Sequence, residues 1–467
     1  MCKTPTYRKS ETGPARPAGA RTARVIRLGA ALAGSAVLVF GAGLACEPHA
    51  LREEPVLLFS ANNGGIIAAC GCPGNPSGGF AKRQGLIEQY RRTCRNVLLV
   101  DPGDLLPDHK NDVLVKYLAR GAARAKYDAI GLGDQEFLVG AERLRALRAE
   151  YDLPMVCANV RDASGEFVVA PHLICSLNDR KVGIFAVIAD RVYGFPPMEW
   201  RRGLVVEDPI VAAKREAEAL AECDLVVALS HQPLHETRRL AAEVAGVDII
   251  VSGHDTTTLL EPEKIGEAIL VGAGQAGDIL GALTLHHDAE GRPEWKQTLT
   301  ELSARVPGAK WVEDLYWDYV KEAKEKPETD WDTPIPVVYE PAEACGKCHE
   351  PEFKQWQTTA HARAYEVIKK TGRQDDPECL MCHTMGFARK GGFESMAKTP
   401  ALGRVTCQAC HVVNSDHHEK GKKAEPRIFL SSRWCMSCHG MVQSPKFDYF
   451  TYKPRIQHRS EEDRKKD

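Results

Sequence analysis

The order of apolar and polar positions between residues 54 and 305 predicts strands and helices in alternation. Apolar runs rich in β-formers recur along this segment, at Val56–Ser60, Val97–Asp101, Ala129–Leu132, Met155–Asn159, Val182–Ile188, Leu225–Leu229, Val247–Ser252 and Ala268–Gly272. Helical patterns lie between them, at Phe80–Tyr90, Val113–Ala125, Glu142–Tyr151, Val211–Ala221 and Glu236–Ala245. Strands separated by helices are typical of a layered α/β domain, in which polar groups at the carboxyl ends of strands converge on a site.

Four side chains capable of binding a metal follow these expected strands. They are Asp104, Asp134, His231 and His254, and each comes directly after an apolar run. Two carboxylates and two imidazoles suit a borderline divalent cation such as zinc, manganese or iron. Taken one at a time, such residues are more often solvated turn residues or helix caps.

The first 45 residues have the order of an export signal. Arg21, Arg24 and Arg27 precede an apolar run over 28–45 that ends in small residues. The alternative is a membrane anchor that is not cleaved, and Cys46, directly after the run, is a candidate for lipid attachment. Export predicts a location in the periplasm or on the outer cell surface, where disulfides and covalent haem can form.

Eight of the sixteen cysteines lie near the C-terminus as four Cys-x-x-Cys-His motifs. This spacing attaches haem c, because the two thiols bond the macrocycle and the adjacent histidine ligates the iron. Four repeats in an exported chain make a zinc ribbon a poor alternative. We therefore expect four covalent haem c groups in residues 337–460, followed by a charged tail over 461–467. The anchors are Cys345, Cys348, Cys379, Cys382, Cys407, Cys410, Cys435 and Cys438, and the proximal ligands are His349, His383, His411 and His439.

Four other histidines in this segment can supply distal ligands: His361, His417, His418 and His458. Since His417 and His418 are adjacent, we do not expect both to serve. The count predicts three bis-histidine haems that use His361, His417 and His458. The remaining haem is then either five-coordinate or ligated by His418. The segment has little apolar periodicity, which fits a mostly helical unit with stacked macrocycles as its core.

The net charge of -2 is the sum of three unlike segments. Residues 1–45 carry a net +6, residues 46–340 a net -14 and residues 341–467 a net +6. This balance argues against a nucleic-acid partner held by a basic surface. The excess of Lys and Arg in the last segment is expected to neutralise haem propionates.

The α/β segment resembles the calcineurin-like metallophosphatases of the 5′-nucleotidase family. The resemblance rests on residues 77–82 (Ser-Gly-Gly-Phe-Ala-Lys) and on four motifs in chain order, which contribute Asp104, Asp134, His231 and His254. It implies a four-layer α/β/β/α sandwich.

Three departures from the family pattern concern its active site. The first family motif, Asp-x-His, is Asn62-Asn63-Gly64 in this chain, the transition-state histidine of the third motif is Gln135, and the last motif, Gly-His-x-His, ends in Thr256 instead of histidine. The resemblance implies that the ligands of one metal are lost. Those of the other metal (manganese, zinc or iron) remain as the four residues above, so a two-metal clamp is not expected.

Cys70 and Cys72 stand in a loop rich in Gly and Pro beside the vacated metal position. Two thiols one residue apart are candidates for a catalytic redox pair or for a soft-metal site. The alternatives are inert buried thiols, or separate disulfides to Cys94, Cys157, Cys175 or Cys223.

The C-terminal segment resembles the tetrahaem cytochrome c family of ammonia-oxidising bacteria. The matching stretches are residues 356–362, 379–387 and 405–411, together with Ser415-Asp416-His417. The resemblance implies electron transfer and the distal ligands given above. Between the two domains, residues 306–336 are expected to be a linker helix followed by a linker rich in Pro.

Together these features predict an exported tetrahaem cytochrome fused to a metallophosphatase-like domain with a degenerate site. Its partners would be redox proteins, such as other cytochromes, quinol-linked complexes or a terminal reductase. An electron-transfer protein or oxidoreductase is favoured over an active phosphohydrolase. Two alternatives remain: a one-metal hydrolase of phosphate or sulfur esters with a haem redox module, and a non-catalytic docking subunit of a respiratory complex.

Overall fold

The structure is a computed structural model. It describes residues 51–68, 78–189, 203–255, 257–274, 277–287, 290, 293–325 and 338–412, together with 417, 425–426, 432–440, 444 and 446–458.

The first sheet of the α/β unit has six strands in the order β14-β13-β1-β2-β3-β4. Its centre is parallel, because β1, β2, β3 and β4 pair in the same direction, whereas β13 and β14 add an antiparallel edge. The strands are β1 (Val56–Phe59), β2 (Val97–Asp101), β3 (Ala129–Gly131), β4 (Met155–Val156), β13 (Ile279–His287) and β14 (Pro293–Glu301).

The second sheet has the order β11-β12-β10-β9-β7-β6. Strands β7, β9, β10 and β12 run parallel, and β6 and β11 are antiparallel strands at the two edges. The strands are β6 (His172–Leu177), β7 (Arg180–Ile188), β9 (Leu225–His231), β10 (Ile249–Ser252), β11 (Glu263–Ile265) and β12 (Ala268–Gly272). A separate two-stranded sheet joins β5 (Val160–Asp162) to β8 (Leu204–Val206).

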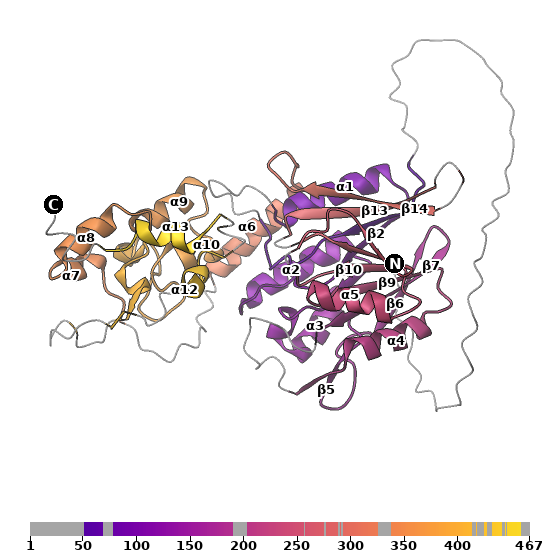
Figure 1. Ribbon diagram of the computed structural model, residues 1–467. Coiled ribbons are helices and arrows are strands. Elements are labelled where there is room, and N and C mark those ends of the chain that lie inside the picture. The colour runs from indigo at the N-terminus through magenta and orange to yellow at the C-terminus, as the bar shows by residue number, and fades with distance from the viewer. Residues whose placement is uncertain are drawn as a thin grey trace, which may run out of the picture.

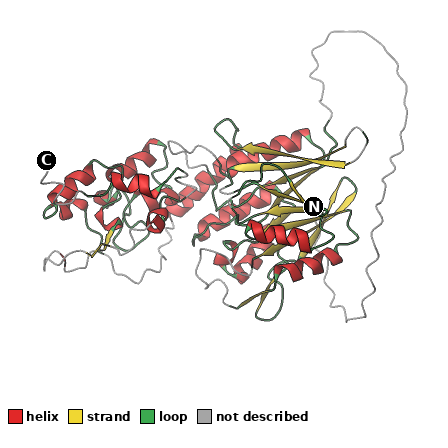
Figure 2. Cartoon of the chain, viewed as in Figure 1, coloured by secondary structure: helices red, strands yellow, loops and turns green. Residues whose placement is uncertain are grey.

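Three apolar cores hold these sheets and helices together as four layers. One core, which includes Leu57, Ala186 and Val251, packs sheet against sheet. A second packs helices on the outer face of the first sheet, and a third packs helices on the outer face of the second. The expected α/β/β/α sandwich is therefore confirmed (Figures 1 and 2). The outer helices are α1 (Phe80–Thr93), α2 (Asp112–Ala125), α3 (Ala141–Tyr151), α4 (Pro209–Ala219), α5 (Leu234–Glu243) and α6 (Lys310–Glu325).

Helix α6 falls in the segment that was expected to be a linker helix. Its apolar stripe, including Val312, Leu315 and Val320, is buried in the same core as α1 and α2. The helix therefore packs against the α/β unit, and it lies beside the C-terminal unit (Figure 1). The hydroxyls of Tyr316 and Tyr319 donate to Asp376 and Glu378 of that unit.

The C-terminal unit consists of short helices with a small apolar core. This core contains Tyr365, Ile368, Leu380, Phe393 and Leu402 among its buried side chains. The helices are α7 (Ala342–Gly346), α8 (Glu350–Gln357), α9 (Ala364–Lys370), α10 (Pro377–His383), α12 (Ser432–Met436) and α13 (Tyr449–Tyr452), and β15 (His411–Val412) pairs antiparallel with β16 (Glu425–Pro426). In the part of the chain that the structure describes, none of the helices has the length and apolar character needed to span a bilayer.

Candidate metal centre and haem-binding segment

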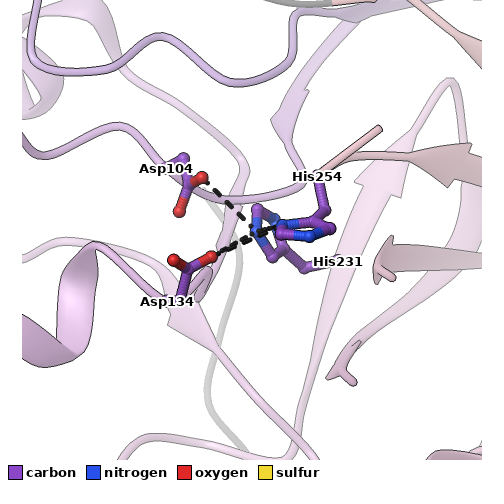
Figure 3. A group of neighbouring side chains, drawn as sticks. All are labelled: Asp104, Asp134, His231 and His254. Carbon is purple, nitrogen blue, oxygen red and sulfur yellow. Dashed lines mark hydrogen bonds and ion pairs between the residues drawn. The ribbon is translucent and has the colours of Figure 1, made fainter. Parts of the chain in front are cut away.

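The four polar residues predicted from the strand ends come together at one place. Asp104 follows β2 and Asp134 follows β3 in the first sheet, while His231 ends β9 and His254 follows β10 in the second. The carboxyl ends of these parallel strands lie at the same edge of the sandwich, so loops from both sheets meet there (Figure 3). Asp104 and His254 adopt left-handed backbone angles, with φ of 59° and 56°, which are uncommon for residues other than glycine and occur often at functional sites.

The distances within this cluster suit one metal ion. One ligand atom from each of the four side chains lies within 4.8 Å of all the others. The Nε2 atom of His231 is 3.2 Å from Asp134 Oδ1, 3.4 Å from Asp104 Oδ2 and 3.2 Å from Nδ1 of His254. The side chains of Asp104, Asp134 and His231 are buried, whereas that of His254 is 19% exposed. Two carboxylates and two imidazole nitrogens converging at this spacing form a donor set for zinc, manganese or iron.

Electrostatics within the cluster favour a cation at its centre. Burial alone would lower the pKa of His231, but Asp104 and Asp134 raise it well above its usual value. Burial alone would raise the pKa of Asp134, but hydrogen bonds with His231 and His254 lower it. The Nδ1 atom of His231 lies 3.1 Å from the carbonyl oxygen of Pro102, which fixes the ring so that Nε2 faces the cluster.

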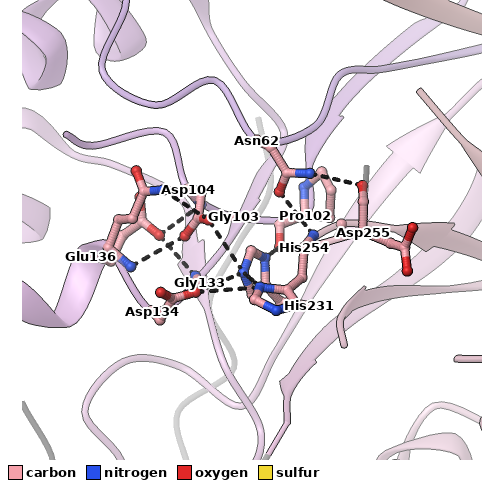
Figure 4. Close-up of polar contacts among 12 residues, drawn as sticks. Asn62, Pro102, Gly103, Asp104, Gly133, Asp134, Glu136, His231, His254 and Asp255 are labelled. Carbon is pink, nitrogen blue, oxygen red and sulfur yellow. Dashed lines mark hydrogen bonds and ion pairs between the residues drawn. The ribbon is translucent and has the colours of Figure 1, made fainter. Parts of the chain in front are cut away.

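The buried carboxylate of Glu136 holds two of the ligand loops in place. It accepts hydrogen bonds from the backbone N–H groups of Asp104, Leu105, Leu106 and Gly133, at 2.8 to 2.9 Å (Figure 4). Burial and the neighbouring Asp104 raise the pKa of Glu136 to about 7. Only glycine fits at 133, since a Cβ there would lie 2.2 Å from Asp104 Oδ1. The sequence contained Glu136 within a motif but gave no indication of this role.

The two asparagines that replace the first family motif form hydrogen bonds within the protein. Asn62 donates to the backbone carbonyls of Asp255 and Gly274, both at 3.0 Å, and accepts from the backbone N–H of His254 at 2.8 Å (Figure 4). Asn63 donates to the buried carboxylate of Asp101. Both amides are thus engaged within the protein, which supports the expectation that the first set of metal ligands is lost.

Gln135 stands where the family has a transition-state histidine. Its side-chain amide donates to Asp104 Oδ2 at 3.1 Å, and its backbone N–H donates to Oδ1 of the same carboxylate at 3.2 Å. An amide in this position orients a ligand but, unlike an imidazole, has no proton to transfer near neutral pH.

The thiol pair predicted beside this cluster, Cys70 and Cys72, lies outside the described residues, and so does Cys46. The structure does describe the four cysteines that were alternative disulfide partners for the loop. Cys175 is disulfide-bonded. The other three are free thiols, so the structure forms no disulfide from the loop to Cys94, Cys157 or Cys223.

The cysteines predicted to anchor haem in the C-terminal unit form two neighbouring groups. The thiol of Cys345 in the first motif lies near that of Cys407 in the third and its pKa is lowered by this contact, and the thiol of Cys382 in the second motif affects the pKa of Cys438 in the fourth in the same way. All eight anchoring cysteines are free thiols. The first and third attachment sites therefore lie side by side, as do the second and fourth.

Three of the four proximal histidines face one of the predicted distal histidines. The rings of His349 and His417 are 6.1 Å apart between centroids and nearly parallel, with an angle of 10°. The rings of His411 and His458 are 6.2 Å apart at 16°. The His439 and His361 centroids are 6.0 Å apart at 44°. Sequence reasoning predicted these three distal histidines but could not assign them to particular haems.

The fourth proximal histidine, His383, differs from the others. Among the described residues, it has no ring contact with a second histidine. Its Nδ1 atom lies 2.7 Å from the carbonyl oxygen of Ala364, which leaves Nε2 available as a ligand. His418, the alternative fourth distal ligand, lies outside the described residues.

The fold and the two clusters define a fusion of a metallophosphatase-like α/β unit with a helical cytochrome c unit. Residues 344–412 match the family model described as cytochrome c554 and c-prime, a family that carries haem c. Cytochrome c-554 of Nitrosomonas europaea is 28% identical over 134 residues, which cover 22% of this chain and 57% of that protein.

The α/β unit is similar to 5′-nucleotidases. The human 5′-nucleotidase is 30% identical over 200 residues, which cover 39% of this chain and 33% of the relative. The solved 5′-nucleotidase precursor from Thermus thermophilus shares the fold, with a TM-score of 0.50, 23% identity, and coverage of 58% of this chain and 59% of that one. The chain thus spans about a third of the 5′-nucleotidases it matches and just over half of cytochrome c-554.

Proposed function

We propose that this protein is an exported tetrahaem c-type cytochrome that transfers electrons, fused to a metallophosphatase-like unit that binds one divalent metal ion. Its partners are redox proteins such as other cytochromes, quinol-linked complexes or a terminal reductase. The basic and apolar order of residues 1–45 supports export to the periplasm or the outer cell surface.

The observation that carries this proposal is the spacing of the three histidine pairs. Two imidazoles that ligate one metal ion from opposite sides, each with a bond of about 2 Å, have ring centres about 6 Å apart. The observed separations of 6.0, 6.1 and 6.2 Å fit an iron between the two rings of each pair. Haem iron closed on both sides by histidine changes oxidation state without exchanging ligands, which suits electron transfer.

The residues that hold each haem follow from these pairs and from the Cys-x-x-Cys-His motifs. The pKa values of His361 and His411 are lowered by burial and by the neighbouring imidazoles, which favours the neutral form that ligates iron. Among the described residues, no second histidine pairs with His383. We therefore assign three six-coordinate haems, and the second haem is either five-coordinate or ligated by His418.

The two units are proposed to divide after α6. The sequence pattern predicts boundaries of 54–305 for the α/β unit, 306–336 for the linker and 337–460 for the haem unit. Since α6 packs into the first core, we place the end of the α/β unit at Glu325.

A hydrolase that uses one metal is the second candidate function, and the cluster of Asp104, Asp134, His231 and His254 favours it. A metal ion bound there would polarise a phosphate or sulfur ester. The test is hydrolysis of a nitrophenyl phosphate with added manganese. The activity would be established if His231→Ala abolished hydrolysis and His235→Ala, which changes an exposed histidine on α5, did not. We expect little hydrolysis, because Gln135 replaces the transition-state histidine.

The loop cysteines Cys70 and Cys72 remain a proposed redox pair or soft-metal site. The test is electron flow through the holoprotein of the Cys70→Ser, Cys72→Ser double variant. If electron flow is the same as in the wild-type protein, a redox role for the two cysteines is contradicted. The third interpretation, a docking subunit, would be favoured if residues 337–467 alone delivered electrons as well as the full chain.

The experiment that tests electron transfer is a coulometric titration of the full holoprotein. We expect four electrons per chain, with the haems of the three histidine pairs low-spin in the oxidised state. His361→Ala, His417→Ala and His458→Ala should each convert one low-spin haem to high-spin, while His235→Ala should convert none. Uptake of fewer than four electrons, or distal variants without a spin change, would contradict the proposal.

A further inference from the structure

The two units meet at the helix that carries the second haem attachment site. Helix α10 begins at Pro377 and contains Cys379, Cys382 and His383. It contacts α6 and the N-terminal end of α2, both from the α/β unit (Figure 1). The contacts gather on Asp376 and Glu378, the two acidic residues directly before and within the first turn of α10.

Asp376 is fully buried at this junction. Its Oδ2 atom accepts a hydrogen bond from the hydroxyl of Tyr316 on α6 at 2.6 Å and forms an ion pair with Arg373 at 2.8 Å. Its Oδ1 atom caps α10 by accepting from the backbone N–H of Glu378 at 3.0 Å. The thiol of Cys379 lies 3.4 Å from the same carboxylate, so a buried negative charge stands next to a haem anchor.

Glu378 is held from the α/β side by three donors. Its Oε1 atom is 2.9 Å from Nδ2 of Asn111, 3.2 Å from the hydroxyl of Tyr319 and 3.3 Å from Nε2 of His109. His109 in turn contacts Asp108 at 3.1 Å. Burial would lower the pKa of His109, but Glu378 and Asp108 raise it to about 10, so the ring is a cation near neutral pH.

The loop that presents His109 also serves the candidate metal centre. Asp104 lies at the start of this loop, after β2, and Asn111 lies at its end. The side chain of Asn111 caps α2 by accepting a hydrogen bond from the backbone N–H of Leu114 at 2.9 Å. One short loop therefore connects the metal cluster to the junction.

We propose that the α/β unit sets the reduction potential of the second haem through the charges of Glu378 and His109 at this junction. The inference rests on the proposed tetrahaem function. A negative charge in a poorly solvated site near a haem favours the more positive ferric state, and a positive charge favours the ferrous state. The two residues come from different units, so a change on the α/β side should reach one haem selectively.

The test is a spectro-electrochemical titration of the full holoprotein that resolves the four haem potentials. Glu378→Gln removes a negative charge, and we expect it to move the potential of the second haem to a more positive value. His109→Gln removes a positive charge from the other unit, and we expect the same haem to move to a more negative value. The other three potentials should remain unchanged in both variants.

Two control variants change the same residue types elsewhere. Glu394→Gln changes an exposed carboxylate of the haem unit that pairs with Lys398, and His235→Gln changes an exposed histidine of the α/β unit. Neither should shift any potential. Intact mass and thermal unfolding establish that each variant carries its full haem content and is folded, and Tyr319→Phe provides a milder change if His109→Gln does not fold.

Several outcomes would overturn the proposal. These are a second-haem potential that His109→Gln leaves unchanged, shifts of the same sign in both variants, or equal shifts in all four haems. If Tyr319→Phe is the only α/β-side variant that folds, an unchanged second-haem potential in that variant overturns it as well. A protein with fewer than four haems would instead contradict the proposed function, so the two failures are distinguishable.

Discussion

The side-chain oxygen of Asn62 accepts a hydrogen bond from the backbone N–H of His254 at 2.8 Å. The same amide donates to the carbonyls of Asp255 and Gly274, so all three of its bonds are made within the protein. An amide is neutral and only its oxygen can ligate, and that oxygen already accepts a hydrogen bond from the protein. The contact ties the end of β1 to the loop that carries a candidate metal ligand, in a place where the family pattern has a metal-binding carboxylate.

This contact predicts that the α/β unit binds one divalent ion per chain. Equilibrium dialysis of the holoprotein with manganese should give a stoichiometry of one. His231→Ala should lower the affinity at least about 10-fold, because a ligand is lost. His235→Ala should not change it. A stoichiometry of two, or equal binding by both variants, would contradict the one-metal assignment.

Glu136 should be important for the stability of the α/β unit. Glu136→Gln places an amide N–H against backbone N–H donors that now share a carboxylate, and an unsatisfied buried donor costs about 1–3 kcal/mol. We expect denaturant unfolding to show that the free energy of unfolding of the α/β unit falls by that amount. Manganese binding should also become weaker. Glu142→Gln, on the first turn of α3 and less buried, is the matched control and should leave both unchanged.

The junction between the units should weaken in alkaline solution. The pKa of His109 is raised to about 10 in the folded protein, from about 6.5 in an unfolded chain. The charged ring pairs with Glu378 and Asp108, so its stabilising contribution is complete below pH 6.5 and is lost as the pH rises through 10. At pH 6 the wild-type protein should unfold at a higher temperature than His109→Gln. This difference in unfolding temperature should disappear by about pH 10.5. A difference that does not depend on pH would show that His109 acts through packing alone.

Gln355 should tune the third haem through its distal ligand. The Oε1 atom of Gln355 is 2.6 Å from Nδ1 of His458, a contact that fixes the ring and increases its basicity as a ligand. Gln355→Leu removes this bond, and a less basic ligand stabilises ferric iron less well. One bis-histidine haem should therefore move to a more positive potential, while Gln357→Leu, at an exposed position on the same helix, should have no effect.

The sequence predicted the parallel strands of the sandwich well and its antiparallel edges poorly. Strands β2 and β12 begin and end as expected, because strands buried between layers are continuous apolar runs. Strands β6, β13 and β14 were not predicted. In β14, which forms a sheet edge, apolar residues such as Trp295 and Leu299 are separated by polar ones, so no continuous run marks the strand.

The metal cluster was predictable, because the ends of parallel strands converge wherever such a sheet forms. The junction was not, since Tyr316 and Glu378 belong to different units and follow no shared periodicity. One local signal was present: Asp376 before Pro377 has the pattern of a helix N-cap followed by proline at the first helical position. That signal predicts the start of α10 but not its partners.

The central claim is that this chain is a tetrahaem cytochrome, and an intact mass of the full protein tests it most directly. The protein would be expressed with haem maturation machinery and measured after denaturation, so that only covalently attached haem remains. We predict a mass gain of four haem c groups. A gain of fewer than four, or a mass that returns to that of the polypeptide, would contradict the claim.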